Sequence, residues 1–533
     1  MDPKTAEILS QTNFTTLDWG IVAVYILGSV VIGLMVKRYV VNMADYVTAG
    51  RAIGTCLGIA TMTGTELGLI TVMYSAQKGF VGGFAAFHIA VVAAIVTFIV
   101  GMTGFIVYRL REMEVLTIPE FYERRFGPKT RIVGGIMLAF GGILNMGLFL
   151  KVGSMFIVGI TGMSNQGWAL PAVMTVLLVL VLIYTVLGGM LSVVVTDYIQ
   201  FVVLSFGLLL TSALAIRELG WNTIFDTVAK EMGAKGFDPT VADGAFGGEY
   251  IIWMCFMGLV GCGIWPTAVA RALAAESPET VKRQYRWSSV SFLIRFLIPY
   301  FWGICAFVYF KTKSPELNEL FFPAAEGAKA FDNLYAMPIF LGRILPAGLI
   351  GIITAGMIAA FMSTHDSYLL CWSSVITQDI VAPIMGDKLD NPARIKLTRI
   401  FVVAIGLYIL YWGLVYEGGE DIWDYMAVTG AIYFTGAFAL LLGGLYWERA
   451  SSTGAMLALI SGFSAIFGLA PVKKAFEIET SSARIGLFTI ALSVVAMVVG
   501  SILFPDRPEN STGDNESMDN GSPVAEEAEG EGK

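Results

Sequence analysis

Thirteen apolar stretches, each long enough to cross a lipid bilayer as a helix, constrain the fold of this chain more than any other feature. A bilayer core needs roughly 20 apolar residues in helical form, and only helices and closed barrels satisfy their backbone polar groups there. With 56% hydrophobic and 14% charged residues, the chain is more apolar than a soluble domain. We therefore predict an all-α polytopic membrane protein with about 13 transmembrane helices. The stretches are residues 19–36, 54–76, 82–108, 132–162, 165–187, 190–215, 248–270, 286–311, 342–372, 397–416, 423–447, 453–471 and 484–504.

Charged residues between the stretches predict the domain boundaries and the orientation. No basic leader or small-residue cleavage site accompanies the first stretch, so we interpret it as a retained helix. In a thirteen-helix arrangement most basic residues share one side, which the positive-inside rule makes cytoplasmic; Lys473 and Lys474 are exceptions. The side predicted to be cytoplasmic carries Lys37, Arg38, Arg51, Arg109, Arg111, Arg124, Arg125, Lys129, Arg131, Lys282, Arg283, Arg286, Lys388, Arg394, Lys396 and Arg399.

This orientation divides the chain into three parts in a plasma membrane, or the inner membrane of a bacterial cell. Residues 1–18 form an extracellular N-terminus, residues 19–504 a transmembrane transporter domain, and residues 505–533 a disordered, acidic cytoplasmic tail. Much of the net charge of −8 comes from that tail, so the charge does not indicate a nucleic-acid partner. Five cysteines inside apolar stretches show no metal-ligand spacing.

A polar run from Ser363 to Ser367 interrupts the apolar stretch around residues 353–379. Polar groups at that depth are costly unless they face protein, water or an ion. In a helix, the carbonyl of Ala360 lies one turn before Ser363 and Thr364, whose side chains lean back over that turn. The three oxygen atoms then converge, which suits a hard cation. The alternative is that both hydroxyls bond to carbonyls three or four residues earlier.

Two apolar stretches are interrupted by glycine and polar residues at their centres. Residues 54–76 carry four glycines and Glu66, a carboxylate at midplane depth, and residues 248–270 carry Gly258, Gly261 and Gly263 shortly before Pro266. The glycines either break these helices and free carbonyls for a cation, or permit close helix packing. Paired interruptions favour an inverted repeat of 5+5 helices, with repeat one at about 54–215 and repeat two at about 248–447.

Six motifs in order resemble the sodium:solute symporters, the family of sodium-coupled sugar, proline, sialate, pantothenate and monocarboxylate carriers. Each is weak alone, and together they span roughly residues 17–455. They are ADYVTAGR at 44–51, LTIPEFYERRFG at 116–127, LGGMLSVVVTDYIQ at 187–200, RALAAESPE at 271–279, LPAGLIGIITAGMIAAFMST at 345–364 and LGGLYWERASSTGA at 442–455.

The resemblance implies a LeuT-type inverted-repeat fold and sodium-coupled uptake. The implied sodium ligands are the carbonyls of Ala60, Thr63 and Ala360 and the hydroxyls of Ser363 and Thr364. A second set, Asp197, Asp366 and Ser367, corresponds to positions that hold a second cation in some family members. Asp366 stands where a hydroxyl is more usual, which leaves three alternatives open: a second sodium, a proton, or a pair with His365.

Substrate residues follow less clearly from the resemblance. Trp265 stands at about the position of an asparagine in the sugar carriers, which disfavours a sugar. His88 falls within one residue of a family position that contacts substrate, or is a core histidine. Lys151 pairs with Glu66, receives a substrate carboxylate, or extends to the outer face. These four residues are the candidates for contact with the solute.

The sequence thus predicts sodium-coupled symport of a small organic solute, a carboxylate or amino acid rather than a sugar, by alternating access. No phosphate loop, metal-ligand set or nucleophile with a base indicates an enzyme or a cofactor other than the transported sodium. The alternatives are a proton-coupled or uncoupled cation channel and a transporter-like solute sensor. The sequence gives no indication of the oligomeric state.

Overall fold

The computed structural model describes residues 3–36, 49–241, 244–324, 329–386, 388–417 and 420–506. Nearly all of them are helical, and the single β-type pairing among them is an isolated bridge between Ile53 and Ala275. The expected all-α class is therefore confirmed. The predicted tail lies outside the described residues beyond Asp506.

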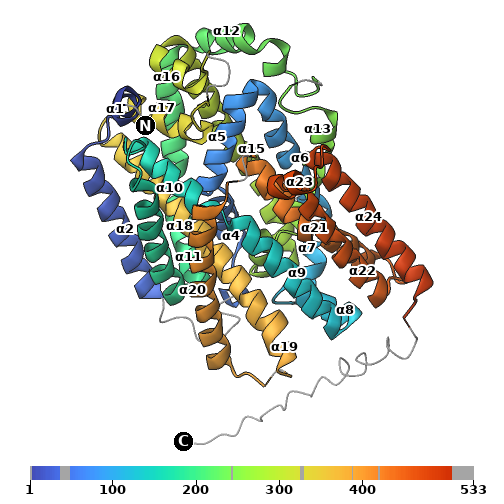
Figure 1. The fold of residues 1–533 in the computed structure, drawn as a ribbon. Coiled ribbons are helices and arrows are strands. Elements are labelled where there is room, and N and C mark those ends of the chain that lie inside the picture. Colours follow the sequence, from blue (N-terminus) through green and yellow to red (C-terminus); the bar gives the residue numbers. More distant parts are fainter. Residues whose placement is uncertain are drawn as a thin grey trace, which may run out of the picture.

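The first half of the chain, to residue 240, builds the flank that includes α2 and α11 and the helices around the first interruption (Figure 1). Its elements are α1 (Pro3–Ser10), α2 (Thr16–Val36), η2 (Ala49–Arg51), α4 (Thr55–Glu66), α5 (Leu69–Gly82), η3 (Gly83–Ala86), α6 (Phe87–Thr103), α7 (Val107–Glu112), α8 (Ile118–Phe126), α9 (Pro128–Met146), α10 (Phe149–Ile160), α11 (Ala169–Leu219), α12 (Trp221–Met232) and η4 (Gly233–Gly236).

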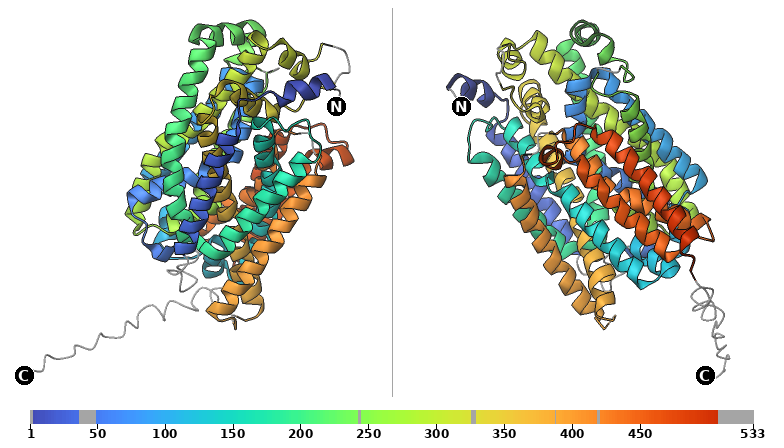
Figure 2. Two further views of the ribbon diagram at one scale, coloured as in Figure 1. Left: turned by 90° about the vertical axis from the view of Figure 1, so that its left-hand side faces the viewer. Right: turned by 45° about the vertical axis from the view of Figure 1, so that its right-hand side comes forward.

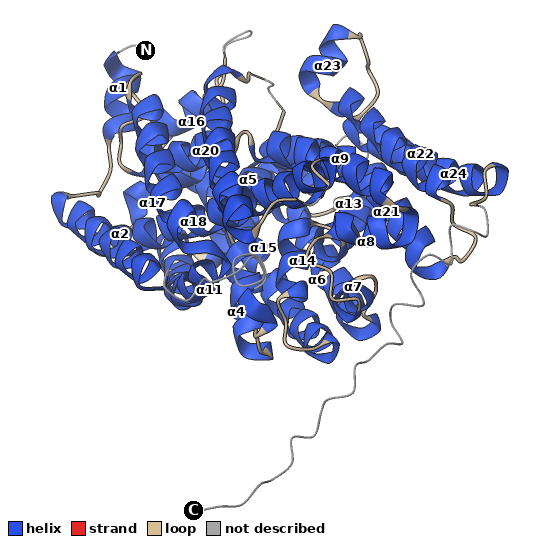
Figure 3. Ribbon diagram, turned by 90° about the horizontal axis from the view of Figure 1, so that it is seen from below, coloured by secondary structure: helices blue, strands red, loops and turns tan. Residues whose placement is uncertain are grey.

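The second half contributes the central helix α18 and the flank of α21, α22 and α24 (Figures 2 and 3). Its elements are α13 (Gly248–Gly263), α14 (Pro266–Leu273), α15 (Pro278–Thr312), α16 (Pro315–Phe321), η5 (Asn333–Tyr335), α17 (Ala336–Ile344), α18 (Leu349–Val375), the π-helix η6 (Ile376–Val381), α19 (Ala382–Ile384), α20 (Asn391–Val415), α21 (Ile422–Tyr446), α22 (Ser452–Gly462), η7 (Phe463–Gly468), α23 (Ala470–Ala475) and α24 (Ser482–Leu503).

Each of the 13 predicted stretches overlaps an apolar helix of the structure. Among the described residues, nine helices are long and apolar enough to cross a membrane, and three more are apolar but shorter. The count is lower than 13 because α5 and α6, which overlap the predicted stretches 54–76 and 82–108, follow each other directly and count as one span, Leu69–Thr103. Gly83 between them leaves helical geometry (φ 59°, ψ −147°).

The predicted stretches 165–187 and 190–215 both lie in α11, an element of 51 residues. Asn165, just before α11, donates a hydrogen bond to Ala6 of α1, and Glu218, at its end, pairs with Lys313 after α15. α1 packs against α16, which directly follows α15. The two ends of α11 therefore lie at the same end of the molecule, so the chain reverses direction within this element.

Both interrupted stretches are broken, as the sequence predicts. α4 ends at Glu66, where Leu67 leaves helical geometry (φ −89°, ψ 54°), and α5 begins at Leu69. α13 ends at Gly263 and α14 begins at Pro266, whose ring has no N–H to donate and whose φ suits a first helical position. The two breaks place helix ends in the middle of the bundle, where the terminal backbone groups are left without partners in the regular helical pattern.

Buried side chains concentrate on α18, where nearly every residue from Ile350 to Val375 is inaccessible. The helix packs against α2, α4, α5, α9, α11 and α20, so it is enclosed on several sides. This position explains why a helix with a central polar run does not face lipid: its polar side chains meet other helices.

Candidate functional site

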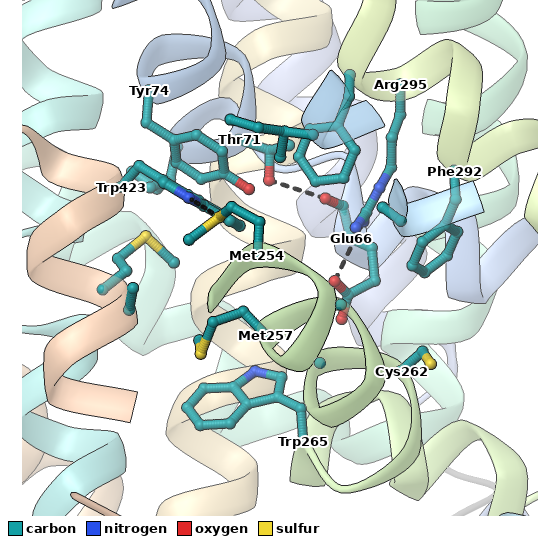
Figure 4. A pocket seen from close by; sticks show the side chains of 18 of the residues that line it. Glu66, Thr71, Tyr74, Met254, Met257, Cys262, Trp265, Phe292, Arg295 and Trp423 are labelled. Carbon is teal, nitrogen blue, oxygen red and sulfur yellow. Dashed lines mark hydrogen bonds and ion pairs between the residues drawn. The ribbon is translucent and has the colours of Figure 1, made fainter. Parts of the chain in front are cut away.

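A cavity of about 120 Å³ lies between the two helix breaks. Its wall is built from α4, α5, α6, α9, α10, α13, α15, α18 and α21, so both predicted repeats contribute (Figure 4). Most of the wall is apolar or aromatic, which is typical of a small-molecule site. The polar and aromatic residues in it are Glu66, Thr71, Tyr74, Thr97, Asn145, Phe149, Trp265, Phe292, Arg295, Phe296, Thr364, Tyr368, Trp423 and Phe434.

Glu66 and Arg295 are the charged residues among those described that line the cavity. Arg295 Nη1 donates to Glu66 Oε2 at 3.1 Å, and the two side chains keep 7% and 17% of their surface exposed. Phe292 and Phe296 lie against the guanidinium, with 3.8 and 4.5 Å between its central carbon and the ring centroids. The aromatic rings hold the cation in place beside the carboxylate.

Glu66 also joins the ion pair to the first helix break, because it is the last residue of α4. Its carbonyl accepts a hydrogen bond from Thr71 Oγ1 at 2.8 Å, across the break (Figure 4). A second, long contact of 3.5 Å brings Thr267 Oγ1 of α14 towards Glu66 Oε1. The carboxylate therefore touches both interrupted helices.

Aromatic side chains close the cavity at two places. At the second break, Trp265 Nε1 donates to the Tyr368 hydroxyl at 2.8 Å. Elsewhere in the wall, Tyr74 of α5 packs against Trp423 of α21 with 4.6 Å between ring centroids, and Trp423 Nε1 donates to Met254 Sδ at 3.0 Å (Figure 4). Since Trp265 already uses its N–H within the protein, it presents mainly an apolar face to a solute.

Beyond Tyr74 and Trp423, an ion-pair network joins α5 to α21. Lys78, one turn after Tyr74, donates to Asp421 and Asp424 at 2.8 Å each. The hydroxyl of Tyr250 donates to Asp424 at 3.2 Å. We call Lys78, Asp421, Asp424 and Tyr250 the α5–α21 clamp.

The residues predicted to bind sodium lie on α4 and α18, which contact each other. Ala60, Thr63, Ala360, Ser363 and Thr364 are all buried. The carbonyl of Thr63 accepts from Leu67 N at 2.8 Å, while its hydroxyl points away towards Ser291 at 2.8 Å. The Thr63 carbonyl, rather than the hydroxyl, is thus the oxygen at the break.

Thr364 lines the cavity and lies against the first helix break. A Cβ on Gly68 would overlap Thr364 Oγ1, so α18 approaches the break closely. Thr364 Oγ1 donates to the Ala360 carbonyl at 2.9 Å, which is the hydroxyl-to-carbonyl bond that the sequence left as an alternative. Both oxygen atoms nonetheless meet at one point, as a cation site requires.

The predicted second set is divided between two neighbouring elements. Asp366 is fully buried and accepts a short hydrogen bond from Thr185 of α11. Ser367 instead accepts from Arg271 of α14 at 2.6 Å, so a cation at Ser367 would lie beside a guanidinium. Asp197 belongs to α11, but its side chain lies outside the described residues.

Two sequence-based alternatives do not match the observed contacts. His365 Nδ1 lies 2.8 Å from the Phe361 carbonyl, and the ring does not pair with Asp366. Lys151 donates to the carbonyl of Tyr416 at 3.1 Å and is not the partner of Glu66. Both histidine and lysine satisfy backbone carbonyls of the protein instead.

Of the four substrate candidates, Glu66 and Trp265 line the cavity, whereas His88 and Lys151 do not. His88 Nδ1 lies 2.7 Å from the Ala85 carbonyl, and its ring packs on Phe246. Arg295 is a residue of the cavity that was not predicted, although an arginine inside the stretch 286–311 meets the same criterion of intramembrane charge that singled out Lys151. Lys78 escaped notice because it lies between two stretches.

The comparisons with known proteins agree with this architecture. The model of the "Sodium:solute symporter family" matches residues 46–462. A sodium/proline symporter of Haemophilus influenzae is 24% identical over 510 residues, covering 89% of this chain and 93% of that protein. A sodium/glucose cotransporter of Vibrio parahaemolyticus is 24% identical over 515 residues, covering 91% and 90%.

Solved structures show the fold. The substrate-bound, outward-open sodium-coupled sialic acid symporter superposes with a TM-score of 0.76 at 19% identity, covering 92% of this chain and 99% of that one. A nucleobase-cation-symport-1 family transporter in a closed conformation gives 0.52 at 12% identity, covering 87% and 97%. The expected LeuT-type fold is therefore confirmed, and with a family match that spans most of its length, the chain belongs to the sodium:solute symporter family.

Proposed function

We propose that this chain takes up a small organic solute, a carboxylate or amino acid rather than a sugar, together with sodium by alternating access. Family membership supports sodium-coupled solute transport and a transporter rather than an enzyme. The observation that carries the proposal is Thr364, because the residue that would hold sodium also lines the cavity between the two broken helices. Sodium at this point would stabilise the break that shapes the solute cavity.

The preference for a charged solute follows from the cavity wall. A sugar needs several hydrogen-bonding side chains that are free to contact its hydroxyls. Here Trp265 bonds to Tyr368, and the amide nitrogen of Asn145 donates to the carbonyl of Met426 at 2.8 Å. The charged pair of Glu66 and Arg295 instead offers groups that match a carboxylate or an amine.

A second coupling ion would involve Asp366 rather than Ser367 in this proposal. Asp366 is buried at the contact between α18 and α11, whereas Ser367 accepts a hydrogen bond from the guanidinium of Arg271. A sodium ion or a proton at Asp366 would remove the cost of burying its charge. One coupled charge moved across about 100 mV contributes about 2.3 kcal/mol.

The end of the molecule that carries α8 would face the cytoplasm, with the N-terminus outside and the C-terminus inside. Arg111, Arg125 and Arg131 all bond to backbone or side-chain oxygens at that end. The opposite end carries the acidic residues of the α5–α21 clamp. This distribution follows the positive-inside rule.

The test is thermal unfolding of the purified chain in sodium and in potassium, for the natural sequence and for Ser363→Ala with Thr364→Ala. A ligand that binds only the folded state stabilises it by about 2.7 kcal/mol at 100 times its dissociation constant. We expect sodium, but not potassium, to raise the unfolding temperature, and the double variant to lose that response.

Thr354→Ala is the matched control, because Thr354 Oγ1 donates to the Ile350 carbonyl at 2.7 Å on the same buried helix. This variant loses the same kind of hydrogen bond one and a half turns or more away from the proposed site, and it should keep the sodium response. If the control and the double variant respond alike, or sodium has no effect on the natural chain, the proposed ion site is wrong. Solute-independent conductance in liposomes would then favour a channel.

A further inference from the structure

The ion pair in the cavity wall is only partly formed. Arg295 uses one nitrogen, Nη1, for Glu66, and this is the sole hydrogen bond of the guanidinium among the described residues. A guanidinium carries five N–H donors in a planar fork that matches a carboxylate. Arg295 can therefore donate hydrogen bonds to a second carboxylate while it stays packed against Phe292 and Phe296.

The carboxylate of Glu66 has spare capacity as well. Its Oε2 accepts from Arg295, and within the part of the chain that the structure describes its Oε1 has only the long contact with Thr267. An ionised carboxylate offers about four acceptor positions. Since 17% of the Glu66 side chain is accessible, an ammonium group in the cavity can reach it.

From these contacts we infer that the transported solute is a zwitterion, with its carboxylate on Arg295 and its protonated amine on Glu66. The inference rests on the proposed function and deepens it. The pair has no net charge, so a monocarboxylate would recruit Arg295 and leave Glu66 as a poorly paired anion in a mostly apolar wall. A simple amine would pair with Glu66 and leave Arg295 as a poorly paired cation in the same wall. A zwitterion satisfies both partners at once.

The rest of the cavity limits what such a solute carries. Met254, Met257, Tyr74 and Trp423 lie across the cavity from the ion pair (Figure 4). These side chains favour an apolar portion, and methionines adapt to its shape. The solute class is therefore a small amino acid or betaine-like compound with an apolar body.

The position of Glu66 also connects the solute charge to the ion. Glu66 ends α4 three residues after Thr63 and two residues before Gly68, which lies against Thr364. An amine bound at Glu66 and sodium bound at Thr364 would both stabilise the same broken segment. Reciprocal coupling between the two ligands follows.

The experiment measures the thermal stability of the full-length protein in sodium with matched probes. L-leucine, 4-methylpentanoate and 3-methylbutylamine form one set, and L-proline, cyclopentanecarboxylate and pyrrolidine form another; the remaining standard amino acids, glycine betaine, glucose and galactose complete the panel. We expect at least one zwitterion to stabilise the protein, and its acid and amine analogues to bind at least about 30-fold more weakly.

Charge variants then test the assignment of each partner. Glu66→Gln should bind the acid analogue at least about tenfold better, relative to the zwitterion, than the natural protein does. Arg295→Gln should bind the amine analogue better, relative to the zwitterion, than the natural protein does. The double variant keeps the wall neutral and serves if a single variant fails to fold; it should lose the preference for the zwitterion. Thr354→Ala, on α18 away from the cavity lining, should keep the preference.

The outcomes separate this inference from the proposed function. If an acid, an amine or a sugar binds as tightly as any zwitterion, or no zwitterion stabilises the protein, the solute class is wrong although sodium still stabilises. If sodium itself gives no stabilisation of the natural chain, the proposed function fails first. Unchanged ratios in both charge variants would overturn the roles of Glu66 and Arg295.

Discussion

Thr364 shows how one side chain can connect an ion site to a solute cavity. Its hydroxyl donates a hydrogen bond to the Ala360 carbonyl and lies close to the backbone of Gly68, and its side chain lines the cavity. A cation held here would touch α18 and the end of α4 together. Gly68 has no side chain, and this absence lets the two elements approach so closely.

Gly68→Ala should therefore abolish the sodium response. The added methyl group would overlap Thr364 Oγ1, and the atom cannot move away because Thr364 belongs to a buried helix. We expect sodium affinity to fall at least about tenfold, or about 1.4 kcal/mol. Sodium titrations followed by thermal unfolding measure this change.

Gly263→Ala provides the comparison, since Gly263 ends α13 at the other helix break and a Cβ there meets nothing within 4 Å. This variant should keep its sodium affinity within about twofold, because an accommodated alanine perturbs little. A sodium affinity that is the same in Gly68→Ala and Gly263→Ala would contradict the close approach on which the ion site depends.

The interrupted helices were predictable as elements because their signals are local. Glycines, Glu66 and Pro266 interrupt apolar stretches within a few residues of the observed breaks. The polar run on α18 was predictable for the same reason. Contacts between distant segments were not: Glu66 and Arg295 are 229 residues apart, and nothing near either residue identifies its partner.

The outcome for Lys151 illustrates the same difference. Its position well inside an apolar stretch indicated that the ammonium group needs a polar environment. Glu66, a solute carboxylate and water at the outer face all stayed open. In the structure the ammonium group of Lys151 donates to the carbonyl of Tyr416, the residue that caps the C-terminal end of α20. Carbonyls at this end of a helix have no N–H partner within the helix. Helix packing, rather than charge pairing, decided this contact.

The α5–α21 clamp should stabilise the packing of these two helices. Lys78 is 5% exposed, and its partners Asp421 and Asp424 are 27% and 33% exposed. Lys78→Met would leave two neighbouring carboxylates without their cation. We expect a loss of about 1–2 kcal/mol, less than for a fully buried pair because water reaches both aspartates.

A double-mutant cycle with Asp424→Asn checks the clamp by thermal unfolding. If the side chains interact, the combined variant is destabilised by less than the sum of the single variants. The pair of Arg484 and Glu249 is the control, since these side chains are 65% and 49% exposed; Arg484→Met should cost no more than about 0.5 kcal/mol. Strict additivity at Lys78 and Asp424 would show that the clamp contributes no interaction energy.

The whole molecule has two chemically different ends. The end that carries α8 collects arginines, and Arg131 there bonds Asp379 at 2.9 Å and the carbonyl of Gln378 at 2.8 Å. At the other end, Lys473 of α23 lines a cavity together with Glu420 and Asp424. Lys473, one of the two lysines that opposed the predicted orientation, thus lies near two carboxylates, which offset its charge locally.

Cysteine labelling tests the orientation directly. Lys313, 49% exposed after α15, and Arg109, 59% exposed in α7, mark opposite ends of the molecule. In a background with all five natural cysteines replaced by serine, Lys313→Cys and Arg109→Cys are each treated in intact cells with a membrane-impermeant thiol reagent. We expect Lys313→Cys to react from outside and Arg109→Cys only after permeabilisation, because the arginine-rich end should remain cytoplasmic. The reverse pattern would place the α5–α21 clamp at the cytoplasmic end, although an inward sodium gradient would still drive the solute inward, because in symport the two move in the same direction whichever way the protein is oriented.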